Sequence, residues 1–460
     1  MNDLNFTEIL HTGSPVHLIG VGGVSMRALA KMLKDMGANV RGSDRDSSIY
    51  TLQLDEMGIP VSIGHRPDNV REAALIIRTA AIHDDNPEIV AANRAGIPII
   101  SRAEAWGFIM KHYPQVVCVS GTHGKTSTTA MIATFAQDCQ LDPTVMVGGD
   151  LPSIGGTLRI GRGDLFVAEA CEYQNSFHAF HPTVAVILNI DRDHLDFFKD
   201  TDDIISSFRK FALLTPENGV VLINGDDQNC RKAVEGLDRK VVTFGFSETC
   251  DVRAVRMEMQ NGRNTCDVLC GDNLYCRMSL AVPGQHNLLN APASAAVAIQ
   301  LGVPSEDFSD GIAAYHGVGR RFEFKKAWRE AKVYDDYAHH PNEIAAALHA
   351  ARSLEPGRVI CAFQPHTYSR TVSLLDEFAE ALKLADKAVI CPIYAAREVN
   401  TYGIYTKDLA EKIPGSVWFN TFEEVTDYIV ANATEGDIVI TLGCGDIYKA
   451  AKMMLSKLKA

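Results

Sequence analysis

Short apolar runs alternate with amphipathic segments along most of the chain. The runs rich in Val, Ile and Leu predict buried strands at residues 16–19, 75–77, 116–119, 165–168, 184–190, 359–363, 388–393 and 438–442. Between them, apolar positions recur at helical spacing, for example over residues 26–36, 343–352 and 374–384. Strands that alternate with helices pair in parallel, because each helix returns the chain to the same end of the sheet. The pattern predicts an α/β fold with parallel sheets.

One stretch departs from this rhythm. Residues 241–282 contain short alternating runs separated by Gly, Asn and Asp turns, a pattern typical of antiparallel hairpins. The chain has 460 residues, and at roughly 150 residues per domain it has room for about three domains. Boundaries near 112–114 and 316–321 give domains at 1–112, 113–319 and 320–460, with the hairpins appended to the second.

Composition narrows the class of protein. Asp and Glu number 57 against 44 Lys and Arg, which gives a net charge of −13. Nucleic-acid binding needs a basic face, so we expect no nucleic-acid partner. The 11 cysteines show no repeated Cys-x-x-Cys spacing, as in a reduced intracellular chain. The first residues lack a signal-peptide pattern, and no apolar run approaches the roughly 20 residues that span a bilayer. We expect a cytoplasmic protein with no membrane partner.

Two glycine-rich loops predict nucleotide sites. The first, with Gly22 and Gly23, follows the strand at 16–19, and Asp44 lies 22 residues after Gly22. Glycines at such a turn let the backbone approach a diphosphate, and a later acid can bind ribose hydroxyls. NAD and a UDP-sugar fit this first loop equally well on chemical grounds.

The second loop follows the strand at 116–119 and precedes an apolar helix. It resembles a shortened P-loop whose amides hold phosphates, with Lys125 reaching the terminal phosphate oxygens and the Thr126 hydroxyl available to Mg²⁺. Glu169 ends a predicted strand, where a second oxygen ligand for Mg²⁺ belongs. A polar cluster at 189–194 follows another strand and suggests further ligands or phosphate contacts.

Four further groups of polar residues add to the picture. Asn287 and Asn290 lie on one face of a helix start and could bind an adenine edge or cap the helix. Arginines and histidines gather at 319–323, 333–341 and 363–371, all at predicted strand or domain ends, where they suit phosphate and carboxylate recognition. Two nucleotide sites in one α/β chain indicate ATP-driven activation of a nucleotide-linked substrate. An NAD-linked oxidoreductase is the alternative from another class, but it has no use for the second loop.

The ordered motifs resemble those of the Mur ligase family over nearly the whole chain. They are GVGGVSM (20–26), GTHGKTSTT (121–129), EACEYQNSF (169–177), NIDRDHLDFF (189–198), GQHNLLNA (284–291), GVGRRFE (317–323), DDYAHHPNE (335–343), FQPHTYSRT (363–371) and IYAARE (393–398). The last three motifs resemble those of the branch that adds alanine. Ser25 and Thr367 depart from frequent family residues.

The resemblance implies a Rossmann-like N-terminal domain, a central P-loop-type ATPase domain and a Rossmann-like C-terminal domain. It implies an enzyme that uses ATP as co-substrate and Mg²⁺ to join L-alanine to the carboxylate of UDP-N-acetylmuramate through an acyl phosphate, in peptidoglycan precursor synthesis. Its partners would then be these small molecules, and the chain a monomer or homodimer. A related ligase that adds another amino acid or a peptide, and a non-catalytic binder of UDP-muramate, remain alternatives.

By the same resemblance, each motif residue has an expected role. Catalysis would rest on Lys125, Glu169 and His194, and the metal on Thr126, Glu169 and His194. The ATP site would comprise Gly121, Thr122, His123, Gly124, Lys125, Thr126, Ser127, Asn287, Asn290, Arg321 and Asp336. The UDP-substrate would contact Gly22, Gly23, Ser43, Asp44, His65, Thr79 and Arg320, and the amino acid Tyr337, His339, His366 and Arg370.

Overall fold

The computed structural model describes residues 3–194, 197–260, 263–328, 331–396 and 398–457. They form two compact units, Met1–Gly148 with Ser153–Phe244, and Gly149–Pro152 with Gly245–Ala460. Each unit is described by itself.

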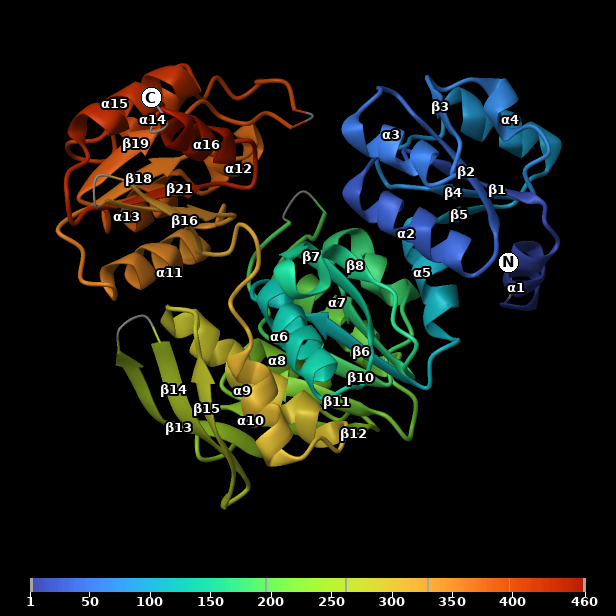
Figure 1. Cartoon of the computed structure of the whole chain (residues 1–460), viewed down its shortest axis with the longest axis horizontal. Helices are drawn as coiled ribbons and strands as arrows, with labels where there is room; N and C mark the ends of the chain where they lie inside the picture. Colours follow the sequence, from blue (N-terminus) through green and yellow to red (C-terminus); the bar gives the residue numbers. More distant parts are fainter. Residues whose placement is uncertain (1–2, 195–196, 261–262, 329–330, 397, 458–460) are drawn as a thin grey trace. The chain divides into compact units, whose positions relative to one another are not determined.

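The first unit begins with a five-stranded parallel sheet, coloured blue in Figure 1, in the order β3-β2-β1-β4-β5. Its strands are β1 (Pro15–Ile19), β2 (Asn39–Asp44), β3 (Val61–Ile63), β4 (Leu75–Arg78) and β5 (Ile99–Ser101). The order reverses between β1 and β4. Ligands of open α/β sheets bind at such a reversal, beyond the carboxyl ends of the strands.

Helices connect these strands. They are α1 (Asp3–His11), α2 (Val24–Asp35), α3 (Ile49–Glu56), η1 (Pro67–Val70), α4 (Pro87–Ala95) and α5 (Arg102–Met110). Side chains of α2 and α5 enter one buried apolar cluster, and those of α4 enter another, because alternate residues of each strand face opposite sides. The first cluster includes Leu18 of β1 and Leu29 of α2, and the second includes Ile19 of β1 and Ile89 of α4.

A second run of strands in this unit has the order β12-β11-β10-β6-β9-β7-β8. The strands are β6 (Gln115–Ser120), β7 (Thr144–Leu151), β8 (Gly156–Arg159), β9 (Leu165–Glu169), β10 (Val184–Ile187), β11 (Val220–Asn224) and β12 (Lys240–Gly245). The helices here are α6 (Lys125–Asp138), η2 (Pro152–Ile154), η3 (Tyr173–Ala179), α7 (Thr201–Leu213) and α8 (Gln228–Val234). All of α6 from Thr126 to Ala136 is buried, so this helix is covered on all sides although its first turn is rich in Thr and Ser.

The second unit contains three antiparallel strands and a six-stranded sheet. The antiparallel strands are β13 (Val252–Gln260), β14 (Arg263–Cys270) and β15 (Asn273–Leu280), followed by α9 (Gln285–Gln300) and α10 (Ser305–Ala313). The sheet has the order β16-β17-β21-β18-β19-β20. Its strands are β16 (Glu323–Trp328), β17 (Ala331–Asp336), β18 (Val359–Phe363), β19 (Lys387–Ile390), β20 (Val417–Trp418) and β21 (Ile438–Leu442).

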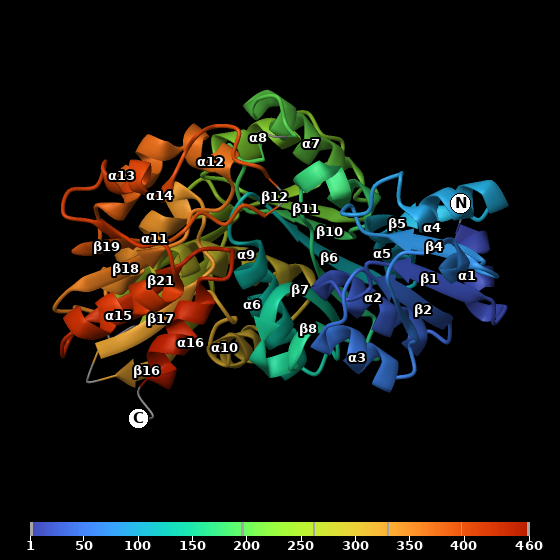
Figure 2. The same cartoon turned by 90° about the horizontal axis from the view of Figure 1, so that it is seen from above.

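This six-stranded sheet is covered on both faces. The helices are α11 (Pro341–Arg352), α12 (Tyr368–Ser373), α13 (Leu375–Leu382), α14 (Thr406–Ala410), α15 (Phe422–Asn432) and α16 (Tyr448–Ser456). Side chains of α11, α13 and α14 pack in one buried cluster and those of α15 and α16 in another. Figure 2 shows β18, β19 and β21 side by side in this unit. The edge strand β16 pairs antiparallel with β17, and the other strands pair in parallel.

The structure confirms an α/β fold with mixed parallel and antiparallel sheets, and it corrects several details. The strand predicted at 184–190 ends at Ile187, and the one predicted at 388–393 spans Lys387–Ile390. The segment at 240–245 is a parallel strand beside β11, so the antiparallel hairpins begin only at Val252. The helix predicted over 374–384 is confirmed as the slightly shorter α13, and the short α12 precedes it. The residues after Ile187 and Ile390 lie beyond the strand ends, toward the candidate site. Apolar periodicity alone does not show where a strand stops.

Within the described ranges, no helix is both long and apolar enough to cross a membrane.

Candidate active site

The predicted phosphate loop connects β6 to α6. Gly121 has a φ of 141° and Gly124 a φ of 84°, backbone conformations that residues with side chains rarely adopt. The segment after β10 braces the loop: the His123 N–H donates to Asn189 Oδ1 at 2.7 Å, and Asn189 Nδ2 donates to the His123 carbonyl at 3.0 Å. A rigid turn of backbone amides before a helix is an anion site. All seven predicted residues lie together in this loop and first helical turn: Gly121, Thr122, His123, Gly124, Lys125, Thr126 and Ser127.

Lys125 lies inside this loop. Its Nζ donates to the Gly121 carbonyl at 2.5 Å and to the Thr122 carbonyl at 3.0 Å, and it lies 2.9 Å from Glu172 Oε2. Burial opposes the lysine charge, but the Glu172 carboxylate outweighs burial and raises the pKa of Lys125 above its ordinary value. Lys125 is therefore a permanent cation at the loop that is predicted to hold phosphates.

Glu172 is a site residue that sequence reasoning missed. Its side chain is 3% exposed, and Oε1 lies 3.6 Å from His194 Nε2. Burial favours the neutral acid, yet Lys125 and His194 lower the pKa of Glu172, so the group is ionised. The signal was its spacing: Glu172 follows the strand-end acid Glu169 by three residues in EACE. The sequence analysis gave a role to Glu169 alone.

Glu169 and Thr126 form the predicted oxygen-ligand pair. The Thr126 hydroxyl donates to Glu169 Oε2 at 2.9 Å, and the Gly148 N–H donates to the same oxygen at 2.7 Å. A Cβ on Gly148 would lie 2.5 Å from this oxygen, so the close approach requires glycine. One hydroxyl and one carboxylate at a phosphate loop are the donor types that Mg²⁺ takes from proteins, alongside phosphate oxygens and water.

His194 reaches the same place by a strained turn. Its φ is 54°, and its ring lies 4.7 Å from the Tyr173 ring, centroid to centroid. It is connected to the Lys125 group through Glu172. Among the described residues, no cluster of three or more His, Cys, Asp or Glu side chains could hold a metal ion by itself. A site made of one or two side chains plus phosphate oxygens does not need such a cluster, so the residues present fit Mg²⁺ bound together with a nucleotide.

The predicted UDP-substrate residues of the first unit follow four of its five N-terminal strands. Gly22 and Gly23 follow β1, Ser43 and Asp44 end β2, His65 follows β3 and Thr79 follows β4. The Gly22 N–H donates to Asp44 Oδ2 at 2.8 Å, which connects the glycine loop to the acid predicted to bind ribose.

A buried acid, Glu88, lies behind this edge. Its carboxylate accepts hydrogen bonds from the Ser43 hydroxyl at 2.6 Å and from the Asn69 amide at 2.5 Å, and His17 Nε2 lies 3.2 Å from it. His65 Nδ1 lies 3.4 Å from its second oxygen. Burial alone would raise its pKa, but the hydrogen bonds from His17, Ser43 and Asn69 lower the pKa of Glu88 to about 2. The Ser43 hydroxyl is thus bonded inside the fold, and Glu88 holds Ser43 in place with His65 beside it.

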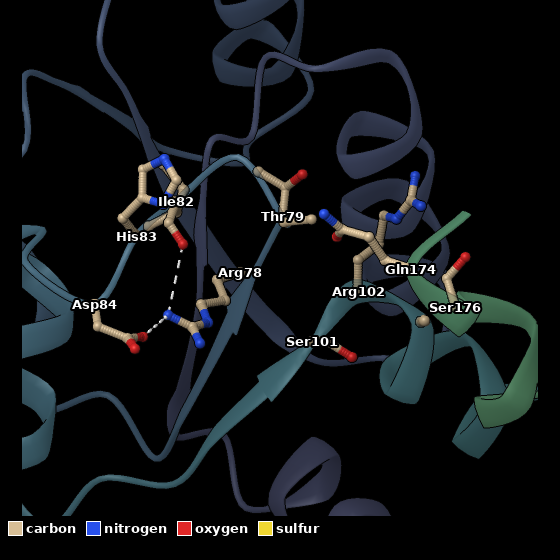
Figure 3. A pocket seen from close by; sticks show the side chains of 11 residues that line it. Arg78, Thr79, Ile82, His83, Asp84, Ser101, Arg102, Gln174 and Ser176 are labelled. Atoms are coloured by element: carbon tan, nitrogen blue, oxygen red, sulfur yellow. Dashed lines mark hydrogen bonds and ion pairs between the residues drawn. The ribbon is translucent and has the colours of Figure 1, made fainter. Parts of the chain in front are cut away.

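A cavity of about 380 Å³ opens at this edge. Figure 3 shows Thr79, Arg102, Gln174 and Ser176 around part of it, with Arg78 paired to Asp84 at 2.5 Å on another part. A second cavity, of about 230 Å³, is lined by the start of α2, by α5 and by Glu169. The two cavities share Arg102, Ala103 and Ser176 in their walls.

The second unit holds the remaining ATP candidates. Asn287 and Asn290 are buried in the first turns of α9, and Asn287 Nδ2 donates to the Pro283 carbonyl at 2.7 Å. Asp336 ends β17 and accepts backbone N–H groups from Phe322 and Ala338, both at 2.6 Å. Burial raises the pKa of Asp336 to about 6.

Arginines pack on aromatic rings in this unit. Arg321 lies 5.1 Å from the Tyr337 ring centroid. Arg320, predicted to contact the UDP-substrate, lies 5.0 Å from the ring centroids of both Tyr337 and Tyr448. Its Nε donates to the buried Asp335 at 3.2 Å, so this arginine is already paired.

The amino-acid candidates also gather in the second unit. The Tyr337 and His339 rings lie 5.5 Å apart, and the His339 and His366 rings 6.1 Å apart. Burial, with the nearby His339 and Arg370, lowers the pKa of His366 to about 4, so it is neutral at neutral pH. Arg370 lies in α12, whose first turn is held by Glu398: Ser369 N–H donates to Glu398 Oε2 at 2.9 Å. Of the motif residues, Leu195, Asp196 and Arg397 lie outside the described ranges.

Comparison with known proteins agrees with this layout. Three family models match the chain in order. The model described as Mur ligase family, catalytic domain, matches residues 15–114. The Mur ligase middle domain matches 119–298, and the model described as Mur ligase, glutamate ligase domain, matches 320–445. The chain belongs to the Mur ligase family.

Curated Mur ligases extend this likeness over the whole length. The chain is 46% identical to a UDP-N-acetylmuramate–L-alanine ligase of Acetivibrio thermocellus over 96% of this chain and 95% of the relative. It is 42% identical to the one of Clostridium novyi, over 98% and 99%. Among solved structures, the UDP-N-acetylmuramate-alanine ligase from Thermotoga maritima is 28% identical, with a TM-score of 0.82 over 97% of this chain and 99% of that chain. The chain has the three-domain α/β Mur ligase fold.

Proposed function

We propose that this chain is the ligase that joins L-alanine to the carboxylate of UDP-N-acetylmuramate, with ATP as co-substrate, in peptidoglycan precursor synthesis. The observation that carries the proposal is the identity of 40–46% to alanine-adding ligases over at least 96% of the chain. The braced phosphate loop around Lys125 supports it, because an NAD-linked oxidoreductase has no use for such a loop.

The chemistry follows from the inertness of a carboxylate toward amines. Transfer of the γ-phosphoryl group to a carboxylate oxygen breaks the bond to ADP and creates an acyl phosphate. The alanine nitrogen then attacks the acyl carbon, a tetrahedral intermediate forms, and phosphate leaves with the electron pair of the broken C–O bond. Such phosphoryl transfer depends on position and charge more than on protein nucleophiles.

Each group of residues has a proposed part in this reaction. Lys125 and the loop amides hold the phosphates, and Glu172 keeps Lys125 charged and in place. Thr126, Glu169 and His194 would hold Mg²⁺, which when bound supplies positive charge beside the transferred phosphoryl group. We assign adenosine and phosphate contacts to Asn287, Asn290, Arg321 and Asp336, and UDP contacts to Gly22, Gly23, Ser43, Asp44, His65, Thr79 and Arg320.

The alanine pocket is proposed at Tyr337, His339, His366 and Arg370. The Arg370 guanidinium suits the alanine carboxylate. The neutral His366 suits the ammonium group, because an uncharged imidazole does not repel it and its free nitrogen can accept a hydrogen bond from it.

We also propose domain boundaries near 112 and 319, which give segments 1–112, 113–319 and 320–460. The three family-model ranges support them. We propose that the enzyme works in the cytoplasm, where ATP is present, as a monomer or homodimer.

The test is phosphate release by the purified chain with UDP-N-acetylmuramate, ATP and Mg²⁺, with one amino acid added at a time. The proposal predicts release that requires the UDP-substrate and is fastest with L-alanine. Release that does not depend on the amino acid, or that is fastest with glycine, serine or a peptide, contradicts it.

A further inference from the structure

Helix α5 presents two unsatisfied donors to the interior of the first unit. It begins immediately after β5, and Ser101 caps it: the Glu104 N–H donates to Ser101 Oγ at 3.2 Å, and the Ser101 N–H donates to Glu104 Oε2 at 2.7 Å. Arg102 and Trp106 are four residues apart and so lie on the same face of the helix. Neither was identified from the sequence.

Arg102 is a partly buried cation without an anion. In the described part of the chain its guanidinium has no hydrogen bond, ion pair or ring contact. Burial lowers the pKa of Arg102, but a guanidinium stays charged at neutral pH. Arg78, in the wall of the same cavity, differs because Asp84 neutralises it at 2.5 Å. A half-buried cation that lines a cavity and has no carboxylate beside it among the described residues is suited to a ligand of opposite charge.

Trp106 is a second donor of the same kind. The residue is 1% exposed, and its indole Nε1 is buried with no hydrogen-bond partner among the described residues. Its ring packs edge-on against Phe166, with centroids 6.0 Å apart. Buried indole N–H groups usually have an acceptor. The residues Arg102 and Trp106 both line the cavity of about 230 Å³ that Glu169 also lines.

Arg102 also lines the larger cavity, so it lies where the two meet. Figure 3 shows the Arg102 side chain beside Gln174, which points toward Thr79. The smaller cavity also contains Val24 and Ser25 of the first turn of α2, where backbone N–H groups favour an anion. Glu169 lies in the wall of the smaller cavity that adjoins the phosphate loop, and the γ-phosphoryl group of ATP would reach the substrate from that side.

UDP-N-acetylmuramate fits this arrangement by its chemistry. It has an anionic diphosphate at one end of the sugar and the reacting carboxylate at another. The carboxylate must lie beside Glu169 and Lys125. The diphosphate then needs a cation on the opposite side of the sugar, at the glycine loop.

We propose that Arg102 binds the diphosphate of the UDP-substrate and that Trp106 donates its indole N–H to an oxygen of the attached sugar. The inference rests on the function proposed above. The segments at or after the ends of β1, β2, β3 and β4 already hold predicted substrate residues. With α5, the segment after β5 contributes as well.

Arg102→Gln in the full chain tests the first part. Because the change removes hydrogen bonds between charged groups, we expect KM for UDP-N-acetylmuramate to rise by about 10- to 100-fold. We expect KM for ATP and for alanine to stay within about two-fold, since neither contacts Arg102. The melting temperature should be unchanged or higher, because Arg102 makes no hydrogen bond or ion pair with the described residues that the change could break. A purely structural arginine predicts the reverse: a lower melting temperature with an unchanged KM.

Two controls sharpen the result. Arg102→Lys should restore part of the affinity, and Arg94→Gln, at an exposed position of α4, should leave KM unchanged. Binding of UDP-N-acetylglucosamine, which has the diphosphate but no lactyl carboxylate, identifies the anion. Loss of its binding in Arg102→Gln supports the diphosphate assignment, and unchanged binding overturns it.

Trp106→Phe tests the second part, because it keeps the aromatic ring and removes the N–H. We expect weaker binding of UDP-N-acetylmuramate but unchanged binding of UDP alone. Equal loss for both ligands, or no loss for either, overturns the Trp106 assignment. Failure of the proposed function is distinguishable, because the unmodified chain would then show no alanine-dependent turnover at all.

Discussion

Glu172 shows how one buried side chain organises the phosphate loop. It pairs with Lys125 at 2.9 Å and lies 3.6 Å from His194, so two residues with proposed catalytic roles share one carboxylate. A buried ion pair seldom stabilises a fold much, because desolvation offsets the attraction. Its effect here is on position and charge: Lys125 stays protonated and directed into the loop.

Lys125→Ala should abolish turnover. The lysine charge serves the phosphoryl-transfer transition state, and loss of such a group typically costs a factor of about 100 to 1000 in kcat. Steady-state phosphate release measures it, with Lys210→Ala as a matched control, since Lys210 is exposed on α7. A kcat close to that of the unmodified chain would refute the placement of ATP at this loop.

Glu88 should make stability depend on pH in acid. Its folded-state pKa is about 2, against an ordinary value of 4.5. A lowered carboxyl pKa contributes stability that is complete above about pH 4.5 and is lost as the pH falls toward 2. The free energy of unfolding should therefore differ between the unmodified chain and Glu88→Gln by a constant amount above about pH 5, and the difference should shrink below it.

Urea unfolding at a series of pH values measures this difference. We expect Glu88→Gln to lose about 3 kcal/mol at neutral pH, because His17, Ser43 and Asn69 lose their charged acceptor. A difference that stays constant down to pH 3 would show that Glu88 is not ionised in the fold.

At the scale of elements, α5 connects the N-terminal sheet to the rest of the first unit. Its residue Gly107 packs against η3 so closely that a Cβ there would lie 1.9 Å from the Ala179 carbonyl oxygen. Trp106 packs on Phe166 of β9. The helix thus holds Arg102 at the cavity through contacts made by the turn that follows it in the chain.

Gly107→Ala should force α5 and η3 apart. Over-packing of this kind costs about 1–3 kcal/mol and should lower the melting temperature by several degrees. Because Arg102 and Ser176 line the same cavity from these two elements, KM for the UDP-substrate should rise as well. Gly357→Ala is the control, since its nearest atom would be at an ordinary 3.6 Å. Equal melting temperatures for the two variants would contradict the close packing.

At the scale of the whole molecule, sequence patterns predicted the alternating strands and helices because buried strands require apolar runs. They also predicted the phosphate loop, because glycines such as Gly121 and Gly124 mark a turn whose backbone takes positive φ angles. They did not identify Glu172, Glu88 or Arg102. Their surroundings come from residues distant in the sequence: Lys125 lies beside Glu172, His17 lies beside Glu88, and Arg102 shares a cavity wall with Glu169. A single chain reveals such roles only when it is folded.

The net charge of −13 also takes on meaning at this scale. ATP and the UDP-substrate are both anions, so the overall field of the protein repels them. Binding must come from local groups, which are the loop amides, Lys125, Arg102 and the arginines of the second unit. The net negative charge does not prevent binding, because salt screens distant charges and the attraction of these nearby groups is stronger than the remaining repulsion.

The most direct test uses UDP-N-acetylmuramate whose carboxylate carries ¹⁸O on both oxygens. Incubated with the chain, ATP, Mg²⁺ and L-alanine, it should yield an alanine-containing UDP product with one ¹⁸O in the new amide and released phosphate with the other, as mass spectrometry would show. Absence of the alanine product, or its formation with unlabelled phosphate, would contradict the account.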